Sequence, residues 1–254
     1  MPAPWAEEWI SAFETVAVVG GRPIALEAHW QRLQASRRTM GCMATPSAVR
    51  RRMVEAARRL PKGADGFRMD VSSHPANPRV AVHVIPRWAR RGAPTGGVDV
   101  ITTVARVSSP AAGPAQVKSR ERLAGALAWH EPRAVAPFEL IVGNAQGLVA
   151  EGSVSNLLIV RRGQVITPPV WVGVLPGVVR EAIIELARRA RISVVEQPIT
   201  RHEFYTAEEA FVTNSLLGVV PVRMADGRRI GRRCPGPITR RLRAAYARWA
   251  RRAA

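Results

Sequence analysis

One primary amine stands out among the side chains of this sequence that could do chemistry. Of the 38 basic residues in the 254-residue chain, 36 are arginine and only Lys62 and Lys118 are lysine. A guanidinium stays protonated, whereas an amine can lose its proton and attack a carbonyl carbon to form a Schiff base. Lys62 lies in the polar segment LPKGADG, where a solvated side chain is the simplest interpretation. We therefore predict that Lys118 is the reactive lysine.

Two short segments have the residue types of an anion site. In LPGVVR, Gly177 precedes a predicted helix, so the backbone N–H groups of Val178 and Val179 would lie at the positive end of the helix dipole. The polar run Thr213-Asn214-Ser215 follows an apolar strand and could complete a phosphate site with its amide and hydroxyl groups. An ordinary helix start and an ordinary turn would explain the same residues.

A carboxylate is the third candidate group. Glu151 lies in VAEGSVSN between two apolar runs, where a buried carboxylate is costly unless it meets a proton or a cation. Asn156 ends the same segment, and we interpret it as a structural residue that closes the turn and aims Glu151.

The charge of the chain raises the question of a polyanionic partner. The formal net charge is +19 and the sequence pI is about 11.7. The arginines are spread along the chain, however, and aromatic residues make up only 6%, which is too few for a base-stacking surface. Binding of nucleic acid is therefore not expected to be the main function, and the arginines are interpreted as a solvated surface.

Several other classes are disfavoured by what the sequence lacks. Cys42 and Cys234 form no CxxC pair, so neither a disulfide framework nor a metal site is expected. No GxGxxG, Walker, GxSxG or HExxH motif occurs. No run of about 18 apolar residues is present, and Glu7 and Glu8 stand where a signal peptide would be basic and apolar. We expect a cytoplasmic protein that does not enter the membrane.

The pattern of apolar residues predicts two mixed α+β domains. A small domain over residues 1–107 is followed by a linker over 108–116, SSPAAGPAQ, and by a large domain over 117–254. The elements predicted in the small domain are strands at 13–19, 67–72 and 79–86, a Gly20-Gly21 turn, and helices at 27–40 and from a Ser47 cap to 60. Those predicted in the large domain are strands within 138–152 and 156–168, at 193–197 and at 209–212, and helices at 178–190, 201–207 and 237–253.

Five segments in order resemble a known family. The helix segment HWQRL, Lys118, EGSVSN, LPGVVREAIIELA and FVTNSLLGVVPV are similar to segments of the class IV (fold type IV) pyridoxal-phosphate enzymes, and the resemblance covers residues 13–246. That family contains branched-chain aminotransferases, D-amino acid transaminases and aminodeoxychorismate lyases. The resemblance implies a two-domain α+β fold, pyridoxal 5′-phosphate as cofactor, a small-molecule amine as substrate and a homodimer.

The resemblance also assigns roles to residues. Lys118 would hold the cofactor covalently and move the substrate's α-proton, and Glu151 would keep the pyridine nitrogen protonated. The phosphate would be bound by the Arg32 guanidinium, the amides of Val178 and Val179, and the Ser215 hydroxyl with Asn214 beside it. Two features depart from the family: the segment before Phe13-Glu14-Thr15 is short, and Glu121 stands where the lyases often have asparagine.

The choice of reaction depends on local patterns. Arg122-Leu123 after Lys118 resembles the lyase pattern K-x-x-x-R-L, whereas branched-chain aminotransferases commonly have tyrosine at the position of Leu123. The segment TNSLLGVVPV also resembles the lyase form more than the small-residue Ser-Gly-Thr form of the branched-chain enzymes. We therefore predict a 4-amino-4-deoxychorismate lyase, which forms 4-aminobenzoate and pyruvate for folate biosynthesis. The alternative is an aminotransferase for D-amino or branched-chain amino acids, and a third hypothesis is a basic, non-catalytic binding protein. The candidates for a substrate carboxylate are Arg68, His74, Arg79 and His83, although all four are more simply explained as solvated.

Overall fold

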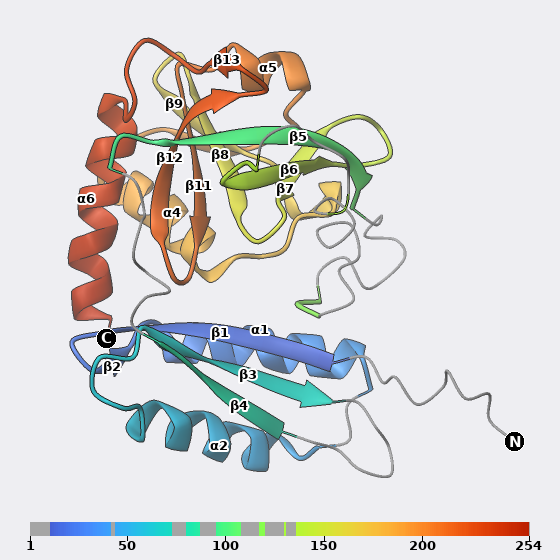
Figure 1. The fold of residues 1–254 in the computed structure, drawn as a ribbon, viewed down its shortest axis with the longest axis vertical. Coiled ribbons are helices and arrows are strands. Elements are labelled where there is room, and N and C mark those ends of the chain that lie inside the picture. The colour runs from blue at the N-terminus through green and yellow to red at the C-terminus, as the bar shows by residue number, and fades with distance from the viewer. Residues whose placement is uncertain are drawn as a thin grey trace, which may run out of the picture. The chain divides into compact units, whose positions relative to one another are not determined.

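A computed structural model describes residues 11–41, 44–72, 80–86, 95–107, 117–119, 130 and 136–253 of the chain. It divides into two compact units (Figure 1). Unit 1 consists of Met1–Arg91, Val117–Glu121 and Ala253–Ala254, and unit 2 consists of Gly92–Gln116 and Arg122–Arg252. Each contains both helices and strands, which confirms the predicted mixed α+β class.

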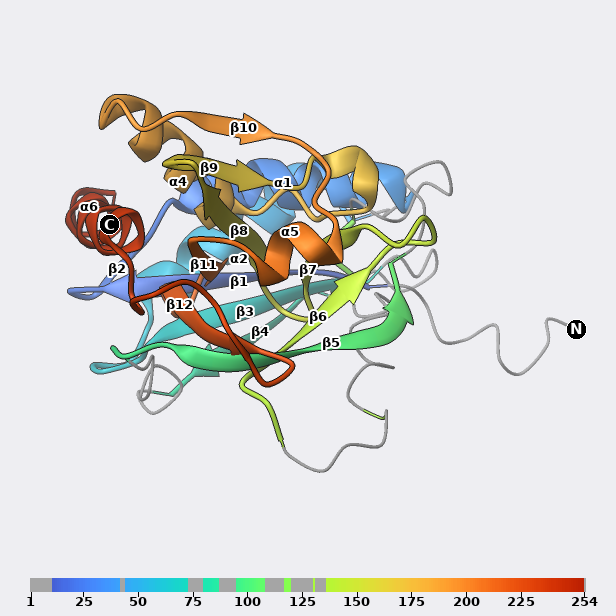
Figure 2. The same cartoon turned by 90° about the horizontal axis from the view of Figure 1, so that it is seen from above.

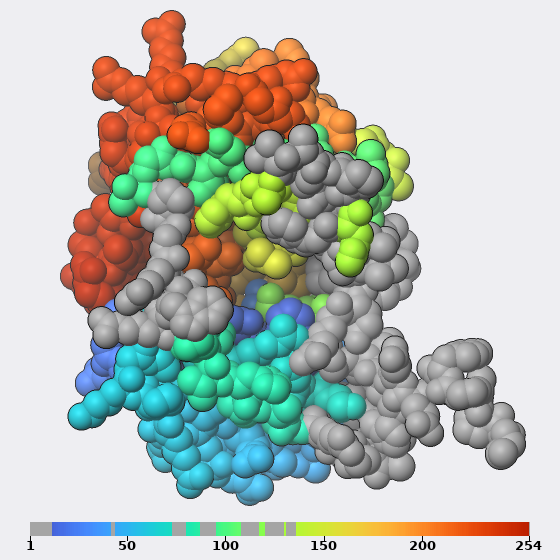
Figure 3. Space-filling model, in the orientation of Figure 1, coloured from blue at the N-terminus to red at the C-terminus, as the bar shows by residue number. Residues whose placement is uncertain are grey.

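Unit 1 is built on a four-stranded antiparallel sheet. The strands, in the spatial order β2-β1-β3-β4, are β2 (Arg22–Pro23), β1 (Ser11–Val19), β3 (Gly66–Ser72) and β4 (Val80–Ile85). Two helices accompany it, α1 (Leu26–Thr39) and α2 (Pro46–Arg58). The outer strand β4 is mostly exposed, and the space-filling view shows it at the surface of the unit (Figure 3).

One face of this sheet carries the core of unit 1. The register pairs Ala12 with Val71 and Val16 with Phe67, and paired residues project from the same face. These side chains pack with Leu33 of α1 and with apolar residues of α2. Glu14 lies on the same face, because it is two residues from both Ala12 and Val16, and so it is directed toward the helices.

Local signals in unit 1 are confirmed with one exception. Gly20 and Gly21 have φ values of 59° and 79°, which matches the predicted hairpin turn between β1 and β2. The helix cap predicted at Ser47 is wrong, since Thr45 occupies the cap position of α2 and Pro46 starts the helix. Proline is favoured at the first helical position, where no backbone N–H is needed.

Unit 2 contains a nine-stranded sheet. Its order is β10-β9-β8-β11-β12-β5-β6-β7, with β13 paired to β12 and with β7 also paired to β8, which closes a ring that starts and ends at β8. The bounds are β5 (Val98–Arg106), β6 (Glu139–Gly143), β7 (Val149–Gly152), β8 (Asn156–Arg161), β9 (Gln164–Thr167), β10 (Val194–Glu196), β11 (Glu209–Asn214), β12 (Gly218–Ala225) and β13 (Arg228–Arg229). Figure 2 shows β9 and β10 side by side, where they pair in parallel.

The helices of unit 2 pack on this sheet. They are α4 (Val178–Arg189), the five-residue α5 (Arg201–Tyr205) and α6 (Pro237–Arg252), together with the short 3₁₀ helix η5 (Val170–Val172). The apolar side of α4 contacts β10 and β11, and α4 packs against α6, which covers β11 and β12. No helix in the described part of the chain is long and apolar enough to cross a membrane.

Two internal segments, and the C-terminal Ala253–Ala254, fall in a different unit from the one that the predicted domains give them. The first is β5, which was included in the small domain but pairs in parallel with β12 and β6 of unit 2. The second is the segment Val117–Ser119, which was assigned to the large domain but joins unit 1, where Ser119 bridges to Ala12. The predicted linker, 108–116, lies outside the described residues.

Candidate active site

Lys118 is held against β1 and α1 in unit 1. Its backbone oxygen accepts a hydrogen bond from Phe13 N over 2.8 Å, and its backbone N–H donates to Ser36 Oγ over 3.3 Å. The Nζ atom lies 4.7 Å from the centre of the Phe13 ring, and the residue is half-buried. The predicted reactive amine therefore has a defined position beside the sheet.

A buried polar cluster joins β1 to α1 in the same unit. His29 and Arg32 are three residues apart on α1, so both face Glu14 of β1. Arg32 donates to Glu14 through Nε and Nη2, both over 2.7 Å, and His29 Nδ1 donates to Glu14 Oε2 over 2.7 Å. Glu14 therefore fixes the plane of the Arg32 guanidinium, which is the group predicted to bind phosphate.

The electrostatics of the cluster set the protonation of its members. Burial alone would raise the pKa of Glu14, but the charge and hydrogen bonds of Arg32, helped by His29, lower it to about 2. Burial is the main cause that lowers the pKa of His29 below its ordinary value, and the nearby charges of Arg32 and Lys118 act in the same direction. At neutral pH the cluster thus holds a carboxylate, a guanidinium and a neutral imidazole, and unit 1 brings Lys118 and Arg32 close to the same histidine.

The residues considered for a substrate carboxylate have partners of their own. Arg68 donates to Asp70 through Nε and Nη2, and its guanidinium carbon lies 3.7 Å from the centre of the Phe13 ring. His83 Nε2 lies 3.6 Å from Asp70 Oδ2. The positive charge of Arg68 is thus paired with Asp70. His74, Arg79, Glu121 and Arg122-Leu123 lie outside the described residues.

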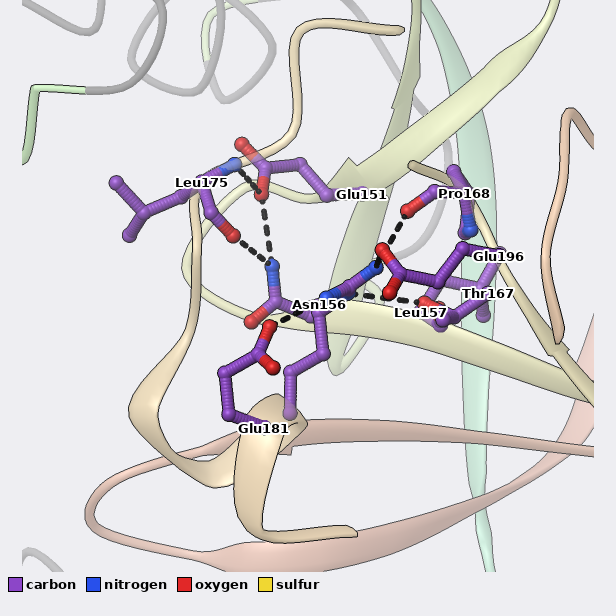
Figure 4. A network of polar contacts seen from close by, with 9 residues as sticks. Glu151, Asn156, Leu157, Thr167, Pro168, Leu175, Glu181 and Glu196 are labelled. Atoms are coloured by element: carbon purple, nitrogen blue, oxygen red, sulfur yellow. Dashed lines mark hydrogen bonds and ion pairs between the residues drawn. The ribbon is translucent and has the colours of Figure 1, made fainter. Parts of the chain in front are cut away.

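Glu151 lies in unit 2 within a closed ring of hydrogen bonds (Figure 4). Glu151 Oε2 accepts from the backbone N–H of Leu175 over 3.0 Å and from Asn156 Nδ2 over 3.1 Å. The same Nδ2 atom also donates to Leu175 O over 2.9 Å. Asn156 therefore does more than close its turn, because it joins Glu151 to the loop that precedes α4.

Gly177 lets the start of α4 lie close to Asn156. A Cβ atom on Gly177 would lie 1.8 Å from Asn156 Oδ1, so only glycine allows this approach. Val178 is the first residue of α4 and Val179 is buried behind it. Helix geometry leaves first-turn N–H groups without an intrahelical acceptor, as the predicted phosphate site requires.

Arg180 is a positioning residue that the sequence analysis missed. Its side chain is fully buried, although it lies in the first turn of a helix. Its guanidinium donates to Glu196 over 2.7 Å, to Pro168 O over 3.0 Å and to Thr167 Oγ1 over 3.2 Å (Figure 4). These bonds attach α4 to β9 and β10. The available signal was an arginine on the apolar side of the predicted helix.

Glu139 is a second residue that sequence reasoning missed. It is buried on β6 and accepts from Ser153 N–H over 3.0 Å and from Ser155 Oγ over 2.7 Å. Both serines belong to the turn that joins Glu151 to Asn156. The carboxylate of Glu139 therefore shapes the turn that carries two of the candidate site residues.

The polar run Thr213-Asn214-Ser215, which was predicted to complete a phosphate site, has a different environment at each residue. Asn214 Oδ1 accepts from Leu217 N–H over 2.9 Å, which gives this side chain a role in the turn between β11 and β12. Ser215 is half-buried in that turn. The Thr213 hydroxyl is buried and has no hydrogen-bond partner within the described part of the chain, and Thr213 pairs with Asn156 in the register of β11 with β8.

The groups in both units fit pyridoxal 5′-phosphate chemically. In unit 2 the Glu151 carboxylate suits a protonated pyridine nitrogen, and first-turn amides of α4 suit a phosphate. The unsatisfied Thr213 hydroxyl lies on a strand that α4 contacts. In unit 1 the Lys118 amine suits an aldehyde, and the Arg32 guanidinium suits a phosphate oxygen.

Comparison with known proteins defines the family. Residues 11–225 match the family described as amino-transferase class IV, and the chain therefore belongs to that family. The resemblance proposed from the sequence is confirmed at this level. The cofactor prediction is confirmed for the family as well, because similar solved structures contain pyridoxamine 5′-phosphate or a phosphopyridoxyl-glutamate compound.

Individual relatives point to one branch of the family. The chain is 38% identical over 148 residues to a protein of Methanocaldococcus jannaschii named a putative branched-chain-amino-acid aminotransferase; the match covers 58% of this chain and 51% of that protein. The chain thus spans about half the length of the curated relatives it matches.

The fold is also similar to solved structures. The branched-chain aminotransferase of Thermoproteus uzoniensis with norvaline matches with a TM-score of 0.83 and 29% identity, over 97% of this chain and 87% of that chain. A putative branched-chain amino acid aminotransferase of Thermotoga maritima matches with a TM-score of 0.82 and 27% identity, over 95% of this chain and 86% of that chain. These relatives support the aminotransferase alternative over the lyase that local sequence patterns favoured.

Proposed function

We propose that this protein is a pyridoxal-phosphate-dependent aminotransferase that acts on branched-chain amino acids. The observation that carries the proposal is Lys118, a half-buried amine attached through its backbone to β1 and α1, beside the Glu14-His29-Arg32 cluster. The names of the relatives support the reaction and the substrate class. The aminodeoxychorismate lyase reaction is the second candidate, supported by the pattern of Lys118 followed by Arg122-Leu123.

The candidate residues have separate tasks in this proposal. The bound cofactor supplies an aldehyde carbon and an electron-withdrawing ring. The Lys118 Nζ atom would hold the cofactor covalently, would be released when the substrate amine takes its place, and would then accept and return the substrate's α-proton. Glu151 holds a proton at the pyridine nitrogen. Each unit offers groups suited to the phosphate: Arg32 in unit 1, and in unit 2 the amides of Val178 and Val179 and the Ser215 hydroxyl, while Asn214 shapes the turn that carries Ser215.

The second lysine provides a matched control for the test. Purified wild-type protein and the variants Lys118→Ala and Lys62→Ala are incubated with pyridoxal phosphate, reduced with borohydride and analysed by mass spectrometry. Lys62 is exposed in the turn after α2, so its variant should keep the reducible attachment. Lys118→Ala should lose the attachment and reduce turnover by roughly 10²- to 10⁴-fold. A Lys118→Ala protein that still carries the reduced cofactor would refute the assignment.

Substrate assays separate the reactions. L-Leucine with 2-oxoglutarate should give glutamate, and the same assay with D-alanine tests the other aminotransferase branch. Release of pyruvate from aminodeoxychorismate without a keto-acid acceptor would support the lyase instead. The homodimer implied by the resemblance stays a prediction, which light scattering tests by comparison with the chain mass of 27.7 kDa.

A further inference from the structure

We propose that Asn156 is a positioning residue that ties the Glu151 carboxylate to the start of α4. The two groups that unit 2 contributes to cofactor binding would then be held at a constant separation. The inference rests on the proposed function, because it concerns how the protein prepares the pyridine and phosphate subsites for one ligand.

The donor side of the Asn156 amide makes the connection. Its Nδ2 atom carries two hydrogens, and it donates to Glu151 Oε2 over 3.1 Å and to Leu175 O over 2.9 Å. The Leu175 N–H returns to Glu151 Oε2 over 3.0 Å. Three hydrogen bonds thus join three segments that lie up to 24 positions apart in the sequence.

The acceptor side of the same amide defines the approach of α4. Gly177, the residue before α4, lies so close to Asn156 that a Cβ atom there would be 1.8 Å from Oδ1 and 2.9 Å from Cγ. The Asn156 amide therefore contacts Leu175 through its nitrogen and Gly177 through its oxygen, and these two residues flank Pro176. A shift of this amide would move the start of the helix as well as Glu151.

Burial makes the connection stiff. Asn156 and Glu151 are each only 5% exposed, so water cannot easily replace a lost hydrogen bond. Other contacts hold the network from outside: Arg180 attaches the first turn of α4 to Glu196, and Glu139 attaches the turn between Glu151 and Asn156. Asn156 links these two supported parts, together with the direct hydrogen bond from Leu175 N–H to Glu151.

A stiff connection between two subsites has a specific consequence for binding. A ligand that fills both subsites gains from their fixed separation, whereas a ligand that fills one subsite does not. Loss of Asn156 should therefore weaken pyridoxal phosphate more than it weakens pyridoxal, which lacks the phosphate, or inorganic phosphate alone. A general loss of folding would weaken all three alike.

The test compares Asn156→Ala with a second buried asparagine of unit 2. Asn144 also caps a turn, since its Oδ1 accepts from the N–H groups of Gln146 and Leu148, and Asn144→Ala is the matched control. Calorimetry measures the dissociation constants of the three ligands. Asn156→Ala should weaken pyridoxal phosphate by roughly 10- to 100-fold and each fragment by less than about threefold, and Asn144→Ala should change none of them by more than that.

A double-mutant cycle shows whether Asn156 acts through Glu151. The double variant Asn156→Ala/Glu151→Gln should bind pyridoxal phosphate no more weakly than the single variant Glu151→Gln. The pH midpoint of the bound cofactor's absorbance should shift in the same direction in the two single variants. Gly177→Ala, which leaves Asn156 in place and pushes its amide aside, should reproduce the loss. If Asn156→Ala does not fold, Asn156→Ser takes its place in every arm.

The outcomes separate the inference from the proposed function. Wild-type protein that does not bind pyridoxal phosphate would contradict the proposed function. If the wild type binds pyridoxal phosphate, three results would overturn the role of Asn156 and leave the proposed function intact. These are equal losses for Asn156→Ala and Asn144→Ala, additive effects in the double variant, and equal weakening of all three ligands.

Discussion

The two units hold their buried carboxylates in different ways. In unit 1, Glu14 and Asp70 are each bound by an arginine through two nitrogen atoms. In unit 2, Glu139 is bound by backbone N–H and hydroxyl groups, Glu209 is bound by backbone N–H groups, and Glu151 Oε2 accepts from an asparagine and a backbone N–H. Removal of the Glu14 carboxylate would leave the buried Arg32 cation, whereas removal of the Glu139 carboxylate would leave neutral donors.

This difference suits what each unit is proposed to do. In unit 1 the carboxylate is a fixed support that orients the Arg32 guanidinium, which needs a defined plane to bind an oxyanion. In unit 2 the neutral donors orient Glu151 without adding a positive charge at Oε2. We infer that a carboxylate serves as a support at Glu14 in unit 1 and as a ligand-binding group at Glu151 in unit 2.

The largest effect is expected where the buried cation would lose its partner. Glu14→Gln keeps the size of the side chain but leaves Arg32 without its counter-charge in a buried position, so the free energy of unfolding should fall by about 3–5 kcal/mol. Urea unfolding followed by circular dichroism measures this change. The exposed pair Arg189–Glu185 supplies the control, because Glu185→Gln should cost less than about 0.5 kcal/mol. A loss below about 1 kcal/mol for Glu14→Gln would remove the distinction between the units.

The second prediction concerns acid. Because the pKa of Glu14 is about 2 in the folded state and 4.5 ordinarily, the unfolded state takes up the proton first as the pH falls. The stability that Glu14 contributes is complete above pH 4.5 and is lost between pH 4.5 and about 2, by about 3 kcal/mol in total. The measurement is the difference in unfolding free energy between wild type and Glu14→Gln across this range. A difference that stays constant down to pH 2.5 would contradict the pairing.

The smallest effect is expected for the same substitution in unit 2. Glu139→Gln keeps an oxygen that can accept from Ser153 and an amide that can face the Ser155 hydroxyl, so the loss should be about 1 kcal/mol. Measured beside Glu14→Gln under the same conditions, this variant gives the direct comparison of the two units. Equal losses at the two positions would show that the chemical type of the partner does not matter here.

Local structure was largely predictable because it depends on neighbouring residues. The helix at 27–40 corresponds to α1 (Leu26–Thr39), and the basic helix at 237–253 corresponds to α6 (Pro237–Arg252), since each has a regular apolar face. The sequence pattern predicted no strand at the position of β5, and its residues fell in the predicted small domain, because the parallel partners β6 and β12 come later in the chain. Parallel pairing leaves no short turn between the strands for a sequence pattern to show.

The reaction type was less predictable than the family. Five ordered segments identified the family correctly, because each carries a separate chemical requirement. The lyase prediction depended on two short patterns, the residues after Lys118 and the segment TNSLLGVVPV, and the comparisons favour the aminotransferase instead. Reaction type is set by side chains that surround the substrate, and these come from many segments.

The amino-acid sequence by itself determined which groups can react: a rare amine at Lys118, a carboxylate at Glu151 and a helix that begins at Val178, since these follow from residue type and local pattern. Only the tertiary structure decided how those groups are held. The pairing of Glu14 with Arg32, the burial of Arg180 and the link from Asn156 to Leu175 and Gly177 all join residues that are distant in sequence or lie on different elements. Their hydrogen bonds depend on distances that exist only after the chain has folded, which no spacing along the sequence specifies.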